Sequence, residues 1–127
     1  MRKILLDASA LLALVKQEPG AEHVSAEIEY AAISIINLTE VVTKLFDAGM
    51  SEEAIQKALT PLNLTIVPFD EELVYETGRL RVSTRKQGLS LGDRACLATA
   101  QKYGASVLTA DRVWLQVNVG VDIRCIR

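Results

Sequence analysis

The stretch KILLDASALLAL, residues 3 to 14, decides the fold. Its first apolar run, residues 3–6, indicates a short buried strand, and residues 8–17 form the pattern of a helix that is apolar nearly all round. A single acid, Asp7, separates the two elements. Two explanations are open for it: Asp7 ends the strand and caps the helix, or it forms one wall of a site that requires negative charge.

The rest of the chain repeats this alternation of strand and helix. Further apolar runs, rich in Ile, Leu and Val, predict strands at residues 31–36, 64–69, 106–110 and 121–126. Helical patterns occupy residues 21–29, 37–48, 52–59, 70–87 and 90–103. Short, continuous apolar strands alternating with helices are typical of a parallel sheet covered on both faces. We therefore expect a three-layer α/β/α fold with a mostly parallel sheet of about five short strands.

Composition narrows the class of protein. The chain has 127 residues, half of them apolar, with a net charge of −2; this predicts a single domain, residues 1–127, with a substantial core. The charge argues against a nucleic-acid binder held by bulk positive charge, yet permits a nuclease with a local basic patch. Cys96 and Cys125 lack zinc-site spacing, and we identify neither a signal peptide nor a transmembrane run, so we expect a reduced, cytoplasmic protein.

Four acids lie where predicted strands end or predicted helices begin. Asp7 and Asp111 follow strands, whereas Glu40 and Asp93 fall in the first turns of helices. A doubly wound sheet brings such positions to one edge, where four carboxylates would repel one another. A divalent cation would neutralise them, because Mg²⁺ prefers oxygen ligands. The pattern thus favours a metal site that activates water at phosphorus.

Each acid also has an ordinary structural explanation. Asp7 and Asp111 occupy positions typical of caps and turns. Residues 37–40 and 90–93 both resemble a capping box, in which an acid three residues after the cap stabilises the helix start. Capping alone, however, does not require four acids to converge on one edge.

Four motifs together resemble one known family. They are LLDASALLAL, ISIINLTEV, LSLGDRACLATA and VLTADRVW, and they extend through nearly the whole chain. In order and placement they are similar to the PIN domain, and within it to the VapC-type toxins of toxin–antitoxin pairs. The resemblance implies a Mg²⁺- or Mn²⁺-dependent endoribonuclease that leaves a 5′-phosphate and a 3′-hydroxyl.

The resemblance also implies roles for particular residues. The acidic quartet that binds the metal and performs catalysis would be Asp7, Glu40, Asp93 and Asp111. Ser9 and Thr109 match small hydroxyl positions near the site, where hydroxyls orient carboxylates. An RNA substrate, a homodimer and a cognate antitoxin protein are the implied partners. The helix at residues 8–15, nearly devoid of polar surface, should lie in the core, with part of its face or its neighbours' covered by a second copy or the antitoxin.

Basic residues offer possible contacts to RNA phosphates. Arg94 and Arg112 each directly follow a quartet acid, and a further group gathers at the end of the helix predicted at 70–87: Arg79, Arg81, Arg85 and Lys86. These side chains would bind phosphate. The alternative is a solvated helix end whose cations suit the helix dipole, with Arg94 and Arg112 merely screening the acids.

Two other functions are compatible with acids at strand ends. A haloacid-dehalogenase-like phosphatase would use Asp7 as its nucleophile, but that chemistry expects a second Asp where Ser9 stands. A non-catalytic, receiver-like Mg²⁺-binding domain would use Asp70, after the third strand, as its phosphoacceptor, but it expects adjacent acids near the first strand.

Overall fold

The computed structural model describes residues 3–127, and its centre is a five-stranded sheet. All neighbouring strands pair in parallel, in the order β3-β2-β1-β4-β5. The strands are β1 (Ile4–Leu6), β2 (Ala31–Ser34), β3 (Thr65–Val67), β4 (Ser106–Thr109) and β5 (Ile123–Cys125). The predicted parallel sheet is confirmed.

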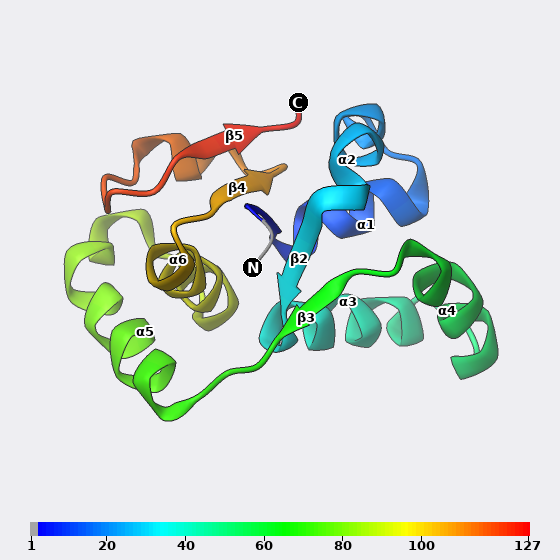
Figure 1. Ribbon diagram of the computed structural model, residues 1–127, viewed down its shortest axis with the longest axis horizontal. Helices are drawn as coiled ribbons and strands as arrows, with labels where there is room; N and C mark the ends of the chain where they lie inside the picture. The colour runs from blue at the N-terminus through cyan, green and yellow to red at the C-terminus, as the bar shows by residue number, and fades with distance from the viewer. Residues whose placement is uncertain (1–2) are drawn as a thin grey trace.

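Helices cover both faces of this sheet. They are α1 (Ala8–Lys16), α2 (Ala21–Glu27), α3 (Ile35–Asp47), α4 (Glu52–Leu59), α5 (Glu71–Ser83) and α6 (Leu91–Tyr103). The chain also contains short 3₁₀ turns: η1 (Ile28–Tyr30), η2 (Thr60–Leu62), η3 (Arg85–Gln87) and η4 (Arg112–Gln116). Figure 1 shows α5 and α6 on one side of the sheet and α1 to α4 on the other.

The two faces of β1 belong to two separate hydrophobic cores. Ile4 and Leu6 pack in the core formed with α1 and α3, whereas Leu5 packs in the core of α5 and α6. Successive strand side chains point to opposite faces, so a continuously apolar strand must be covered twice. Burying each such leucine contributes about 1.5–3 kcal/mol. The predicted three-layer α/β/α architecture is therefore confirmed.

The boundary between β2 and α3 differs from the prediction. The strand ends at Ser34 rather than residue 36, because the Ser34 hydroxyl accepts a hydrogen bond from Ile36 N (3.2 Å) and caps the helix. Two β-branched residues, Ile35 and Ile36, resemble strand in sequence but form the first helical turn. The interpretation of residues 37–40 as a capping box was therefore wrong. Glu40 lies in the second turn of α3, not the first.

Other element ends also differ from the prediction. The helix predicted to reach residue 87 ends at Ser83, and η3 follows it. Helix α1 is buried by its own chain: Ala10, Leu11 and Ala13 are fully buried, as predicted for the core. That a second copy or the antitoxin covers part of this helix or of its neighbours stays a prediction. Within residues 3–127, no helix is both long and apolar enough to cross a membrane.

Candidate metal and catalytic site

The site lies where the strand order reverses. The chain adds β2 and β3 on one side of β1, then returns to add β4 and β5 on the other. Strands β1 and β4 pair through Leu6 and Leu108, and the bond from Asp7 N to Leu108 O (3.2 Å) extends this pairing. Ligands of open parallel sheets bind outside the carboxyl ends of strands at such a switch point. Asp7 and Asp111 follow these two strands.

Asp7 is buried, and hydrogen bonds hold both of its carboxylate oxygens. Oδ1 accepts from Ala10 N (2.8 Å), which caps α1, and from the Ser9 hydroxyl (2.8 Å). Oδ2 accepts from the Thr109 hydroxyl at 2.5 Å. Burial raises the pKa of Asp7 to about 6, although these hydrogen bonds lower it, and the negative charge of Asp93 raises it slightly further. Asp7 is therefore a helix cap and also a carboxylate held in an unfavourable environment.

Asp93 is fixed at the start of α6 by a capping box, as the sequence predicts. Asp93 N donates to the Ser90 hydroxyl and Ser90 N donates to Asp93 Oδ2, each at 3.1 Å. Among residues 3–127, none donates a hydrogen bond to Asp93 Oδ1. The cap therefore uses one carboxylate oxygen of Asp93 and not the other.

Glu40 reaches this helix start from α3. Asn37 Nδ2 donates to Glu40 Oε1 (2.8 Å) and to the backbone oxygen of Gly92 (3.0 Å). One amide group thus joins α3 to the first turn of α6, next to Asp93. Sequence reasoning missed this role for Asn37, because it placed the residue at a helix cap.

Three acids act on the pKa of Cys96. This thiol is fully buried, and burial raises its pKa well above the usual value, followed by the negative charges of Asp7, Asp93 and Glu40. The acids that follow β1 and lie in α3 and α6 are therefore close enough to Cys96 to act on the pKa of one thiol. Sequence reasoning used the cysteine only to infer a reducing environment.

Asp111 lies at the rim of this group. Its Oδ1 caps η4 by accepting from Val113 N (3.0 Å), and its own N–H donates to the Thr109 hydroxyl (3.0 Å). Thr109 therefore bridges Asp111 to Asp7. Burial raises the pKa of a second thiol, Cys125; the positive charge of Arg112 lowers it, and the negative charges of Asp111 and Asp7 raise it further.

The donor chemistry of the site fits Mg²⁺ or Mn²⁺, which prefer carboxylate oxygens. Within residues 3–127, no three acidic, His or Cys side chains lie close enough together to form a complete cage. Mg²⁺ does not require one, because it is usually held by one or two carboxylates with waters and substrate phosphate. The raised pKa of buried Asp7 indicates a carboxylate that a nearby cation would stabilise.

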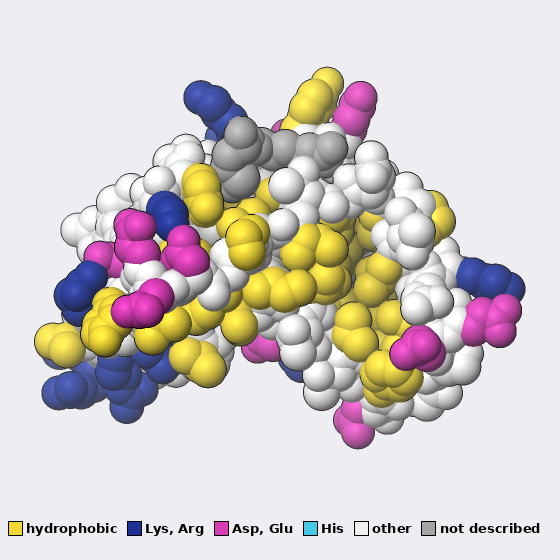
Figure 2. Space-filling model, turned by 60° about the horizontal axis from the view of Figure 1, so that its bottom comes forward, with side chains coloured by type: hydrophobic (Ala, Val, Ile, Leu, Met, Phe, Trp, Pro, Cys, Tyr) yellow, Lys and Arg dark blue, Asp and Glu magenta, His cyan; other side chains and the backbone are white. Residues whose placement is uncertain are grey.

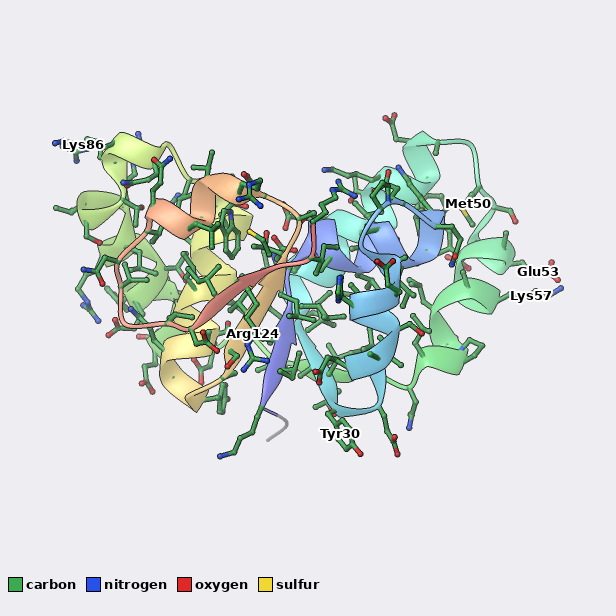
Figure 3. The ribbon with its side chains drawn as sticks, turned by 90° about the horizontal axis from the view of Figure 1, so that it is seen from above. Tyr30, Met50, Glu53, Lys57, Lys86 and Arg124 are labelled. Atoms are coloured by element: carbon green, nitrogen blue, oxygen red, sulfur yellow. The ribbon has the colours of Figure 1, made fainter. Side chains whose placement is uncertain are left out.

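The basic residues do not form one cluster around the acids. Arg94 Nη1 donates to Thr77 O (3.0 Å) on α5, and Arg112 Nη1 donates to Arg127 O (3.1 Å). Arg79 pairs with Glu76 on α5. Arg85 and Lys86, in η3, are exposed, and Figure 3 shows Lys86 extending outward at one end of the molecule.

The chain is thus an α/β/α domain with acidic residues near the switch point of its parallel sheet. Comparison with known families gives one match: the family model of the PIN domain matches residues 4–120. The chain therefore belongs to the PIN-domain family. No curated protein matches the sequence.

Solved structures share the fold at low sequence identity. The toxin–antitoxin protein pair VapBC2 from Rickettsia felis, bound to a promoter DNA fragment, has a TM-score of 0.74 and 17% identity, covering 96% of this chain and 97% of that chain. A toxin–antitoxin complex from Klebsiella pneumoniae has a TM-score of 0.72 and 22% identity, covering 98% of both. DNA-bound VapBC from Salmonella typhimurium has a TM-score of 0.71 and 20% identity, covering 100% of both.

Proposed function

We propose that the protein is a Mg²⁺- or Mn²⁺-dependent endoribonuclease and the VapC-type toxin of a toxin–antitoxin pair. The observation that carries the proposal is the proximity of three acids at the switch point of the sheet: Asp7, Glu40 and Asp93. Membership of the PIN-domain family and the fold shared with VapBC complexes support it. The protein would act in the cytoplasm.

The chain's own residues prepare the site for this chemistry. Ser9 and Thr109 fix the Asp7 carboxylate, and the capping box fixes Asp93. A divalent cation bound by these acids would supply activation of a water molecule and stabilise charge at phosphorus. Asp111, exposed at the rim, is the quartet member best placed to meet solvent and substrate.

The receiver-like alternative is disfavoured by strand order. Receivers have the order 2-1-3-4-5, which places the third strand beside the first. Here β2 separates β3 from β1, so Asp70 does not follow a strand adjacent to that of Asp7. Asp70 instead caps α5 and pairs with Lys102 Nζ at 2.6 Å. The phosphatase alternative requires a second carboxylate where Ser9 stands. The Ser9 hydroxyl instead donates a hydrogen bond to Asp7.

A protein partner and a homodimer belong to the same proposal. A groove of about 420 Å³ runs between α3, α4 and β3, with apolar walls that include Leu38, Val42 and Ile55. Figure 2 shows apolar side chains gathered across the middle of one hollowed face. Such surfaces mark protein interaction sites. An antitoxin segment or a second copy would cover them, and light scattering at micromolar concentration should report a dimer of the isolated chain.

Cleavage of a labelled, single-stranded RNA tests the proposal. The purified chain should cut it in Mg²⁺ or Mn²⁺ and lose activity in EDTA. Asp7→Asn should reduce the rate by at least ~100-fold, because it removes a charge that would hold the metal. The matched control is Asp122→Asn, at the opposite, amino edge of the sheet beside Ser106. Full activity in EDTA would refute the proposal.

A further inference from the structure

Glu40 is held over the first turn of α6 in a way that helix packing alone does not require. Its Oε1 accepts from Asn37 Nδ2 (2.8 Å), and the same nitrogen donates to Gly92 O (3.0 Å). Both hydrogens of the Asn37 amide are therefore used, one on each helix. A reversed amide would place oxygen against two acceptors, so the network fixes its orientation.

Gly92 leaves the space that the Glu40 carboxylate occupies. A Cβ added there would approach Oε1, Cδ and Oε2 of Glu40 to well under 3.0 Å, a separation that real Cβ atoms essentially never show. The Glu40 carboxylate thus occupies the space that any larger residue would fill. Gly92 does not have the positive φ that demands glycine, so backbone strain is not the reason for this residue.

Asn37 is also a residue that lowers the stability of the fold. It is 1% exposed, and its Oδ1 is among the buried side-chain atoms in residues 3–127 that have no hydrogen-bond partner. An unsatisfied buried acceptor costs free energy that an apolar residue of similar size would avoid. Its donors serve only Glu40 and the helix that carries Asp93.

We propose that Asn37 and Gly92 are positioning residues that place the Glu40 carboxylate beside Asp93 as an oxygen ligand for the divalent cation. This inference rests on the proposed function. Asn37 supplies the hydrogen bond that points the carboxylate, and Gly92 supplies the space that receives it. Neither residue contacts the cation or the substrate in this role; both act through Glu40.

Gly92→Ala separates positioning from folding. The atoms that a Cβ would displace are the end of a flexible side chain, so Glu40 can swing away while α6 stays folded. The matched control is Gly78→Ala in α5, where a Cβ meets no atom within 4 Å. Both changes put a better helix former into a helix. Asn37→Leu, of similar size but without donors, provides an independent second variant.

The experiment measures Mn²⁺ affinity by the electron paramagnetic resonance signal of free Mn²⁺, with urea unfolding as a check on folding. Gly92→Ala and Asn37→Leu should each weaken Mn²⁺ binding by roughly 10-fold or more, the range typical of residues that orient metal ligands. Gly78→Ala should bind like wild type. In a Glu40→Ala background, Gly92→Ala should have no further effect, because the side chain through which it acts is gone.

The two proposals fail in different ways. If the wild type binds Mn²⁺ and cleaves RNA but folded Gly92→Ala binds equally well, the positioning role is wrong and the nuclease stands. An additional loss from Gly92→Ala in the Glu40→Ala background would also overturn it. If the wild type binds no Mn²⁺, both proposals fall together.

Discussion

The Thr109 hydroxyl donates a hydrogen bond of 2.5 Å to Asp7 Oδ2, across the carboxyl ends of the paired strands β1 and β4. The same hydroxyl accepts from Asp111 N (3.0 Å), and Ser9 Oγ accepts from the neighbouring Ala110 N (2.9 Å). Two small hydroxyls thus fasten together the chain segments that carry two of the quartet acids.

Thr109→Val should raise the pKa of Asp7 above its value of about 6, because the hydrogen bond from Thr109 favours the ionised carboxylate. A hydrogen bond to a charged group contributes about 1.5–3 kcal/mol, which corresponds to roughly one pKa unit or more. The pKa of Asp7 in the metal-free protein can be followed by carbon NMR. Thr99→Val is the control, since that buried hydroxyl donates to Ala95 O within its own helix. An unchanged pKa of Asp7 would contradict the account.

Asp7 should make the metal-free protein less stable as pH rises. Its pKa is 3.8 when exposed and about 6 in the folded state, so the folded chain binds the proton more tightly. The stabilisation is complete below pH ~4 and is lost as pH rises to ~6 and slightly above, amounting to about 3 kcal/mol. Urea unfolding from pH 4 to 7.5 in EDTA should show this loss in wild type relative to Asp7→Asn. A constant difference between the two proteins across this range would exclude it.

Asp93→Asn should separate the cap from the site. Asn preserves the capacity to cap α6, so the free energy of unfolding should change by less than about 1 kcal/mol. RNA cleavage should nevertheless fall by at least ~100-fold, because a negative charge near Asp7 is lost. Circular dichroism in urea and initial cleavage rates provide the two readouts. Equal activity with unchanged stability would reduce Asp93 to a helix cap.

Lys86→Gln tests the basic end of η3 as an RNA contact. If Lys86 meets phosphate, KM should rise with little change in kcat, and the slope of log affinity against log salt should decrease by about 1. Lys57→Gln is the matched control, because Lys57 lies on α4 at the opposite end of the molecule and pairs with Glu53 (Figure 3). An equal effect of both changes would indicate only a loss of general positive charge.

The alternation of apolar runs with helical patterns was sufficient to predict the layers of this fold. Apolar residues alone did not reveal the end of β2, because Ile35 and Ile36 suit either element and a single hydroxyl, on Ser34, decides between them. The strand order likewise depends on packing between distant segments. The double-sided burial of β1 followed most directly from the sequence, because a continuously apolar strand must be covered on both faces. Leu5 packs against one helical layer, and Ile4 and Leu6 pack against the other.

Asp7, Asp93 and Asp111 could be predicted as candidate site residues because they lie at strand and helix ends, which the sheet topology brings together. Glu40 does not follow this rule, because it lies in the second turn of α3. Their supporting residues were not. Asn37 and Gly92 are 55 residues apart in sequence, and their contact exists only once α3 and α6 pack. The direction of the Arg94 side chain depends on the packing of α5 against α6, because its guanidinium donates to Thr77 O on α5.

The most direct test of the account is the effect of Mn²⁺ on the stability of wild type and Asp7→Asn, measured by urea unfolding at pH 7.5. In EDTA, Asp7→Asn should be the more stable protein by about 1–3 kcal/mol, because it lacks the buried charge. In ~10 mM Mn²⁺, wild type should gain RT ln(1 + [L]/Kd), about 2.7 kcal/mol at one hundred times Kd, and Asp7→Asn should gain little. The difference between the proteins should therefore shrink or reverse. An equal response of both proteins to Mn²⁺ would contradict a cation site at Asp7.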